Sequence, residues 1–202
     1  EPNWPKYMTF LKGQIRELCT NYGKISGIWW DMNVPGYVDP SVNAMIRQLQ
    51  PAAIINDRGF DEGDYGTPER HVPEGRAFQR RTEGCQSLGA YSWGYKEDED
   101  YFSDKFAMQS LDKILAMGGN YLLNVGPRPD GTIGEEFTRP LAHVGKWYCK
   151  VKESFDAKPA PAMTSNPNVL VTQRGRKVYV HLYKDPETTG ILLADFAALP
   201  AK

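Results

Sequence analysis

The sequence predicts an α/β fold, in which part of a (β/α)8-type barrel is followed by a small antiparallel β-domain. Patterns typical of helices and of buried strands alternate through residues 1–160, and short strand patterns replace them in residues 161–202. Repeated helix–strand units favour parallel strands joined by right-handed crossovers. Polar or aromatic side chains follow the predicted strands, which is typical of the catalytic face of (β/α)8 enzymes. We therefore assign residues 1–160 to the barrel and residues 161–202 to the start of a β-sandwich-like domain.

The first helix–strand unit ends in an aspartate. Apolar residues recur at helical spacing in residues 7–18, and the Asn-Tyr-Gly stretch at residues 21–23 ends that helix. Residues 25–30 are rich in β-forming residues and predict a buried strand. Asp31 follows this strand directly. A carboxylate at a strand end is either a turn residue or a catalytic group, and the pattern alone leaves both interpretations open.

The second unit ends in a polar cluster. A helix is predicted for residues 42–49, because Asp39-Pro40-Ser41 is a start signal and Pro51 is a stop signal. The strand pattern of residues 52–55 follows, and Asn56-Asp57-Arg58 comes next. Residues 59–78 are dense in Gly, Pro and charge and are longer than most connections, so they predict a functional loop.

Two more strands and two more helices complete the barrel pattern. The strands are predicted at residues 86–95, which include Trp93 and Tyr95, and at residues 120–127, which include Asn124; the helices are predicted at residues 102–115 and 137–151. A barrel needs eight strands and about 250 residues. We therefore expect a preceding segment, on this chain or a companion chain, to supply the first strands. After the Pro-rich stretch, strands are predicted at residues 169–173, 177–183 and 190–196, the first two as a hairpin.

Composition excludes several classes of partner. The chain has 202 residues, is 41% hydrophobic and carries a formal net charge of −1, which favours neither nucleic acid nor an anionic membrane as a partner. No apolar run approaches the roughly 20 residues of a membrane span. The three cysteines are widely spaced and indicate neither a disulfide framework nor a metal site, and no glycine fingerprint indicates a nucleotide cofactor. The composition leaves a homo-oligomer open.

Five motifs together resemble one enzyme family. They are, in chain order, GIWWDM, PAAIINDRG, DYGTPERHVPE, SLGAYSWGY and GGNYLLNVGPRPDGTI. In this order they resemble the C-terminal half of the catalytic barrel of glycoside hydrolase family 29 α-L-fucosidases, and the residues after 160 resemble that family's C-terminal β-domain. The resemblance implies a retaining exo-α-L-fucosidase that acts on fucosylated oligosaccharides or glycoconjugates without a metal or cofactor. It also implies a secreted, periplasmic or lysosomal location.

The resemblance also assigns roles to individual residues. It implies that Asp31 is the catalytic nucleophile and Glu69 the general acid/base, with Trp29, Arg58 and Trp93 contacting fucose. His71, beside Glu69, is a candidate for the aglycone side. The histidines that the family places on the first half of the barrel have no counterpart here, and the family's GEAIY stretch is replaced by residues 152–155.

The chemistry fits these roles. Retention needs two carboxyl groups about 5–5.5 Å apart, one to attack the anomeric carbon and one to protonate the leaving oxygen. Tryptophans suit the deoxysugar because its methyl and ring C–H groups are apolar. Arg58 can hydrogen-bond hydroxyls or hold a carboxylate.

Alternatives remain for each role. Glu83 is the next candidate for the acid/base, since the loop of Glu69 is rich in carboxylates. The tryptophans are alternatively core residues, and Asp57 with Arg58 is alternatively a structural ion pair. As a second function, the chain is a non-catalytic carbohydrate-binding or structural fragment that lacks a complete site.

Overall fold

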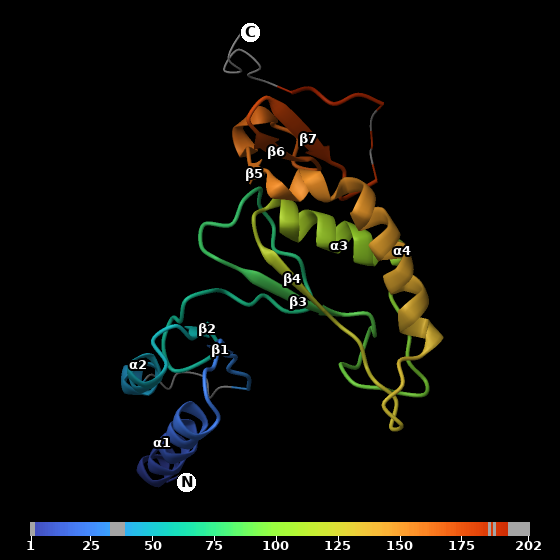
Figure 1. Ribbon diagram of the computed structural model, residues 1–202. Coiled ribbons are helices and arrows are strands. Elements are labelled where there is room, and N and C mark those ends of the chain that lie inside the picture. Colours follow the sequence, from blue (N-terminus) through green and yellow to red (C-terminus); the bar gives the residue numbers. More distant parts are fainter. Residues whose placement is uncertain (1–2, 33–38, 186, 188, 194–202) are drawn as a thin grey trace. The chain divides into compact units, whose positions relative to one another are not determined.

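The computed structural model describes residues 3–32, 39–185, 187 and 189–193. The chain divides into two compact units, residues 1–67 and residues 68–202, and each is described here by itself (Figure 1). The domain boundary predicted near residue 160 is not tested by this division and stays a prediction.

The first unit contains two helices and one pair of parallel strands. Helix α1 (Trp4–Asn21) and helix α2 (Pro40–Leu49) were both predicted, and each begins at a polar cap: Asn3 accepts a hydrogen bond from the Lys6 N–H, and Asp39 accepts one from the Ser41 N–H. A proline in the first turn fits both starts, because its missing N–H has no partner there in any case.

Strands β1 (Gly27–Ile28) and β2 (Ile54–Ile55) are shorter than the predicted runs. They pair in parallel, with Gly27 opposite Ile54. A side chain at Gly27 would come within 2.9 Å of the Ile54 carbonyl oxygen, so the close pairing needs glycine.

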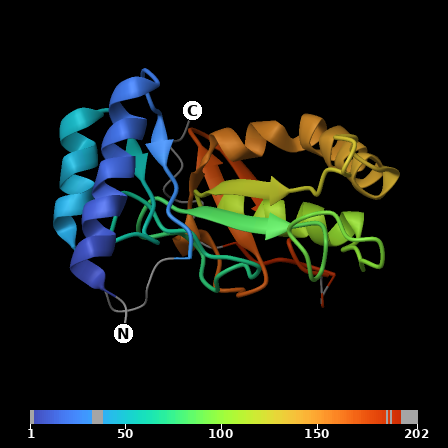
Figure 2. The ribbon, with the colours of Figure 1, turned by 90° about the horizontal axis from the view of Figure 1, so that it is seen from below.

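The core of the first unit lies between its helices and strands. Helices α1 and α2 lie side by side (Figure 2). The buried cluster consists of Met8, Ile15, Cys19, Val42, Ile46, Ala53, Ile55 and Phe60. Burial of such side chains contributes roughly 1.5–3 kcal/mol each, and this is what fixes the two short strands against the helices.

The second unit contains the other parallel pair. Strand β3 (Glu83–Ser87) pairs with β4 (Asn120–Asn124) in register, and helices α3 (Asp104–Ala116) and α4 (Glu135–Val151) accompany them. The two parallel pairs agree with the predicted parallel strands, whereas closure into a barrel stays a prediction. The predicted strand at residues 86–95 was wrong in position, because the chain turns sharply at Gly89, where a Cβ would approach the Ser92 carbonyl oxygen to 2.8 Å. Trp93 and Tyr95 therefore follow the third strand instead of lying in it.

The chain continues into a three-stranded antiparallel sheet. Its strands are β5 (Lys158–Pro159), β6 (Leu170–Arg174) and β7 (Lys177–His181), in that order across the sheet. The predicted hairpin is confirmed, and Gly175 adopts the positive φ of 58° that its tight turn requires. The third predicted strand was wrong for residues 190–193, which form none, and residues 194–196 lie outside the described residues.

Candidate active site

Asp31 lies just beyond β1, in contact with Arg58. The Asp31 Oδ1 is 3.2 Å from the Arg58 Nη1, and the aspartate side chain is 59% exposed while that of Arg58 is only 17% exposed. The guanidinium also lies over the Trp29 ring, 4.6 Å from its centroid. The first unit thus brings together three predicted site residues. The carboxylate is held on one side by a permanent charge and is open to solvent on the other.

Thr67 fixes the orientation of Arg58. The arginine donates from Nε to the Thr67 Oγ1 and from Nη2 to the Thr67 carbonyl oxygen, both at 2.9 Å. Thr67 in turn donates from its N–H and its hydroxyl to the Asp57 carboxylate, at 3.0 and 2.8 Å. A guanidinium presents its donors in a fixed plane, so these bonds aim Nη1 at Asp31. No sequence signal marked Thr67, because its partners lie about ten residues away in an irregular loop.

Glu69 lies in the second unit, beside β3. Residues 68–70 pair with Cys85: the Arg70 N–H donates to the Cys85 carbonyl oxygen at 3.0 Å, and the Cys85 N–H donates to the Pro68 carbonyl oxygen at 2.9 Å. His71 lies close by, with Nδ1 3.2 Å from the Glu69 carbonyl oxygen. The main chain of Glu69 is therefore fixed on the strand, and the predicted neighbours Glu69 and His71 are in contact through that main chain.

Arg70 connects this segment to Trp93. Its guanidinium carbon lies 4.4 Å from the centroid of the Trp93 ring. The same group donates to three successive carbonyl oxygens, those of Gly89 at 3.3 Å, Ala90 at 2.8 Å and Tyr91 at 3.3 Å. Its backbone has a φ of 58°, which is uncommon for a residue other than glycine and is typical of functional sites. Sequence reasoning missed Arg70, because its partners lie about twenty residues away in another loop.

Two further side chains hold the loop that carries Trp93. The Glu99 carboxylate accepts from the Tyr91 N–H at 2.7 Å and from the Ser92 N–H at 3.1 Å. Asn124, at the end of β4, donates from Nδ2 to the Trp93 carbonyl oxygen at 2.5 Å. The Asn124 amide thus fixes the tryptophan backbone from the neighbouring strand.

Glu83, the rival acid, occupies a different place. It is the first residue of β3 and pairs with Asn120, the first residue of β4. Trp93 and Asn124 belong to the opposite, carboxyl ends of these strands. In (β/α)8 enzymes the catalytic groups gather at the carboxyl ends. The position of Glu83 therefore favours a structural role for it.

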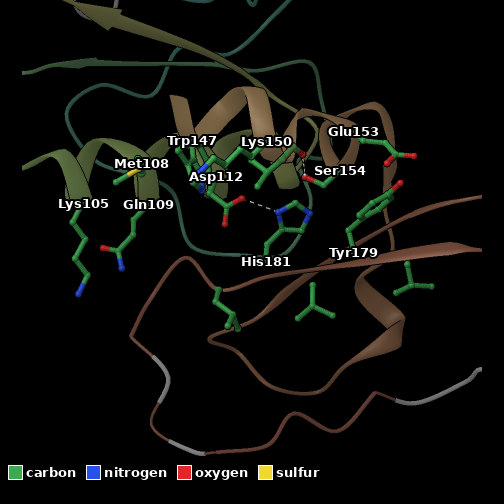
Figure 3. A pocket seen from close by; sticks show the side chains of 14 residues that line it. Lys105, Met108, Gln109, Asp112, Trp147, Lys150, Glu153, Ser154, Tyr179 and His181 are labelled. Carbon is green, nitrogen blue, oxygen red and sulfur yellow. Dashed lines mark hydrogen bonds and ion pairs between the residues drawn. The ribbon is translucent and has the colours of Figure 1, made fainter. Parts of the chain in front are cut away.

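A cavity of about 690 Å³ elsewhere in the second unit contains none of the predicted residues. It is lined by α3, α4 and β7, and its floor is the contact between His181 and Asp112, where Nδ1 and Oδ1 are 2.7 Å apart (Figure 3). The His181 Nε2 lies 2.9 Å from the Thr172 hydroxyl, which donates to the Ser154 carbonyl oxygen at 2.9 Å. These buried polar groups satisfy one another, so they fasten the antiparallel sheet to the helices.

The described residues form neither a metal-binding cluster nor a membrane-spanning helix. No group of three or more His, Cys, Asp or Glu side chains in this part of the chain is placed to hold a metal ion. None of the helices described is both long and apolar enough to cross a membrane.

Comparison with known proteins gives one consistent result. The family model described as Alpha-L-fucosidase matches residues 1–153. Tissue alpha-L-fucosidase from Bos taurus is 33% identical over 149 residues, which cover 69% of this chain and 32% of that protein. The chain thus spans about a third of the length of this curated relative.

Two solved structures extend the likeness beyond the family match. Alpha-L-fucosidase isoenzyme 1 from Paenibacillus thiaminolyticus is similar over 90% of this chain and 48% of its own, with a TM-score of 0.76 and 30% identity. The Thermotoga maritima alpha-fucosidase in complex with a mechanism based inhibitor is similar over 87% of this chain and 42% of its own, with a TM-score of 0.67 and 25% identity.

Proposed function

Because the chain belongs to the alpha-L-fucosidase family, we propose that it carries the two catalytic carboxyl groups of a retaining exo-α-L-fucosidase. The substrate class is a fucosylated oligosaccharide or glycoconjugate with terminal α-L-fucose. Because the chain spans about a third of its curated relative, this activity belongs to the complete protein that contains residues 1–202.

The reaction proceeds in two displacements. In the first, the Asp31 carboxylate attacks the anomeric carbon as the glycosidic bond breaks, and the Glu69 carboxyl group gives its proton to the leaving oxygen. In the second, the Glu69 carboxylate removes a proton from water, which attacks the same carbon and releases Asp31 and fucose. Retention requires carboxyl groups about 5–5.5 Å apart, so the proposal requires both residues to act on one sugar.

The observation that carries the proposal is the contact among Asp31, Arg58 and Trp29. A nucleophile needs a fixed position and an open approach, and the aspartate has both: it is 3.2 Å from Arg58 and 59% exposed. The indole beside it provides apolar surface for the C–H groups of the deoxysugar. A turn or capping aspartate needs no such arginine.

Glu69 is proposed as the acid/base ahead of Glu83. Its backbone is fixed by the pairing with Cys85, and through Arg70 it is joined to the loop of Trp93. Glu83 lies at the amino end of its strand, away from the carboxyl ends where barrel enzymes place their acids. His71 is proposed to contribute to the aglycone side.

The alternative, a binding or structural fragment without catalysis, is less well supported. The family model covers residues 1–153, and both proposed acids lie within that range. A binding module would need the tryptophans but not the pair of acids.

The test is Asp31→Gly in the complete protein that contains this chain. Without the nucleophile, turnover of an aryl α-L-fucoside should fall by at least about a thousandfold, and added azide should restore part of it by attacking from the vacated side to give β-fucosyl azide. Product stereochemistry is read by proton NMR. Asp57→Asn serves as a comparison, because it disturbs the neighbouring network without removing the nucleophile. A variant at Asp31 that keeps more than a few per cent of the activity would contradict the assignment.

A further inference from the structure

The side chain of Asn56 takes the place of a strand next to Asp31. The last main-chain bond of the β1–β2 pair runs from the Asn56 N–H to the Ile28 carbonyl oxygen, at 3.4 Å. Beyond that point the Asn56 amide replaces the partner strand: its Oδ1 accepts from the Trp30 N–H at 2.7 Å, and its Nδ2 donates to the Trp30 carbonyl oxygen at 2.9 Å. This explains why β1 is shorter than its apolar run.

Only a carboxamide of this length can make both bonds. Aspartate offers acceptors alone, and alanine offers neither group. Asn56 is 0% exposed, so in the intact protein water does not compete for either bond. Loss of the amide therefore frees a Trp30 peptide that the fold otherwise holds in one orientation.

The position of Asp31 depends on that peptide. Asp31 is the next residue, and its side chain is 59% exposed, with Arg58 at one oxygen. On its other side Met32 adopts a φ of 53°, which is uncommon for a residue other than glycine. The backbone thus leaves regular pairing on one side of Asp31 and enters a rare conformation on the other, and the Asn56 amide is the contact that fixes the first side.

We propose that Asn56 is a positioning residue for the nucleophile, acting through the Trp30 main chain. The inference rests on the proposed role of Asp31. A displacement of about 1 Å at a reacting group can cost on the order of a hundredfold in rate, so the amide matters for turnover more than for substrate binding.

Asn43 offers a matched control. It is also a fully buried asparagine that contacts Trp30, but it accepts from the indole Nε1 at 3.0 Å and donates to Asp61, without touching the Trp30 main chain. Removal of either amide leaves partly buried partners without a bond. Only removal of Asn56 releases the peptide next to Asp31.

The experiment compares Asn56→Ala and Asn43→Ala in the complete protein that contains this chain. We expect Asn56→Ala to lower kcat on an activated aryl α-L-fucoside by about 10- to 100-fold with KM changed by less than about twofold. Asn43→Ala should keep kcat near that of the parent protein at a similar loss of thermal stability. Equal effects of the two substitutions on kcat, or an unchanged kcat in Asn56→Ala, would overturn the inference.

Two further measurements distinguish failure of the proposed function from failure of the proposed role of Asn56. If the unsubstituted complete protein does not turn over the substrate, the proposed function fails and the inference fails with it. If Asn56→Ala does not fold, hydrogen exchange in the parent protein decides: the Trp30 amide should exchange as slowly as the Ile54 amide, which donates within the ladder to the Ser26 carbonyl oxygen at 3.1 Å. A Trp30 amide that exchanges as fast as an exposed one refutes the role of Asn56.

Discussion

Arg58 shows how one side chain can serve several groups at once. Its donors reach Thr67 twice and Asp31 once, and its flat face lies against Trp29. A lysine offers a single point charge and cannot hold these partners together. At the scale of residues, the first unit therefore depends on the planar shape of the guanidinium as much as on its charge.

The acid/base role can be tested at Glu69 by varying the leaving group. A general acid matters most when the leaving oxygen is a poor leaving group. Glu69→Ala should therefore lower kcat/KM for a natural fucosyl disaccharide by about 10²–10⁴-fold and much less for a dinitrophenyl fucoside. Steady-state kinetics on both substrates give the answer.

Glu83→Ala is the control for that comparison, because Glu83 is the rival carboxylate on the adjacent strand. It should lower both rates alike, through stability alone. If the effect of the substitution on kcat/KM depends on the leaving group for Glu83→Ala but not for Glu69→Ala, the general acid/base role belongs to Glu83.

At the scale of elements, the caps account for the accuracy of the helix predictions. Asp39 at the start of α2 accepts from the Ser41 N–H and hydroxyl and lies 3.0 Å from the Lys12 ammonium of α1. The hydrogen bonds from Ser41, followed by the one from Lys12, lower the pKa of Asp39 below its usual value. Such a carboxylate stabilises the folded state only while it is ionised.

The pH dependence of Asp39 has a definite sign. Its pKa is lowered on folding, so its contribution is fully present above the unfolded value of about 4 and is lost as pH falls through the lower folded value. Asp39→Ala should cost about 1 kcal/mol of unfolding free energy at pH 7, and the difference from the parent should shrink below about pH 4. Urea unfolding at both pH values measures this.

Asp185→Ala is a suitable control, since the contact of Asp185 among the described residues is an exposed ion pair with Lys105, and its loss should change stability little. An Asp39→Ala penalty that is constant between pH 7 and pH 3 would refute the role of its charge.

Strands and site contacts were harder to predict than helices, for physical reasons. Helix starts depend on caps and prolines that lie next to them in the sequence. The end of β1 depends on Asn56, which is distant in the sequence, and the end of β3 depends on the turn at Gly89. The cluster after each strand was predictable, because polar residues at strand ends are visible in the sequence. Thr67 and Arg70 were not, because their partners are chosen only when the loops fold.

At the scale of the whole molecule, each strand pair has one covered and one open face. A half-barrel predicts that Ile28, Trp30, Ile55 and Leu123 point toward the barrel interior and lack partners, and this prediction is wrong. All four pack on the helix-side cores. The open positions are their neighbours, Ile54 at 53% and Leu122 at 40% exposure. Side chains alternate between the two faces of a strand, and the prediction assigned these four residues to the wrong face.

The open faces lead to a prediction about completeness. Large apolar side chains on exposed strands favour association, so residues 1–202 expressed alone should form dimers or aggregates and lack turnover. Ile54→Lys with Leu122→Lys should reduce the association, as measured by sedimentation velocity. Leu192→Lys, at a position 85% exposed outside any strand, should not. A monodisperse and fully active residue 1–202 polypeptide would refute the need for a further barrel segment.

The contacts between Arg70 and the loop of Trp93 limit how that loop can be engineered. The Arg70 guanidinium donates to three successive main-chain carbonyl oxygens, at Gly89, Ala90 and Tyr91. These bonds depend on the backbone conformation of the loop, and the side-chain contact is with the tryptophan ring. Apart from Gly89 and Trp93, the loop can therefore vary in sequence as long as its backbone keeps this curvature. A graft of residues 88–95 from another family member needs a donor that also has arginine at position 70, and a library that randomises the loop should leave that position unchanged.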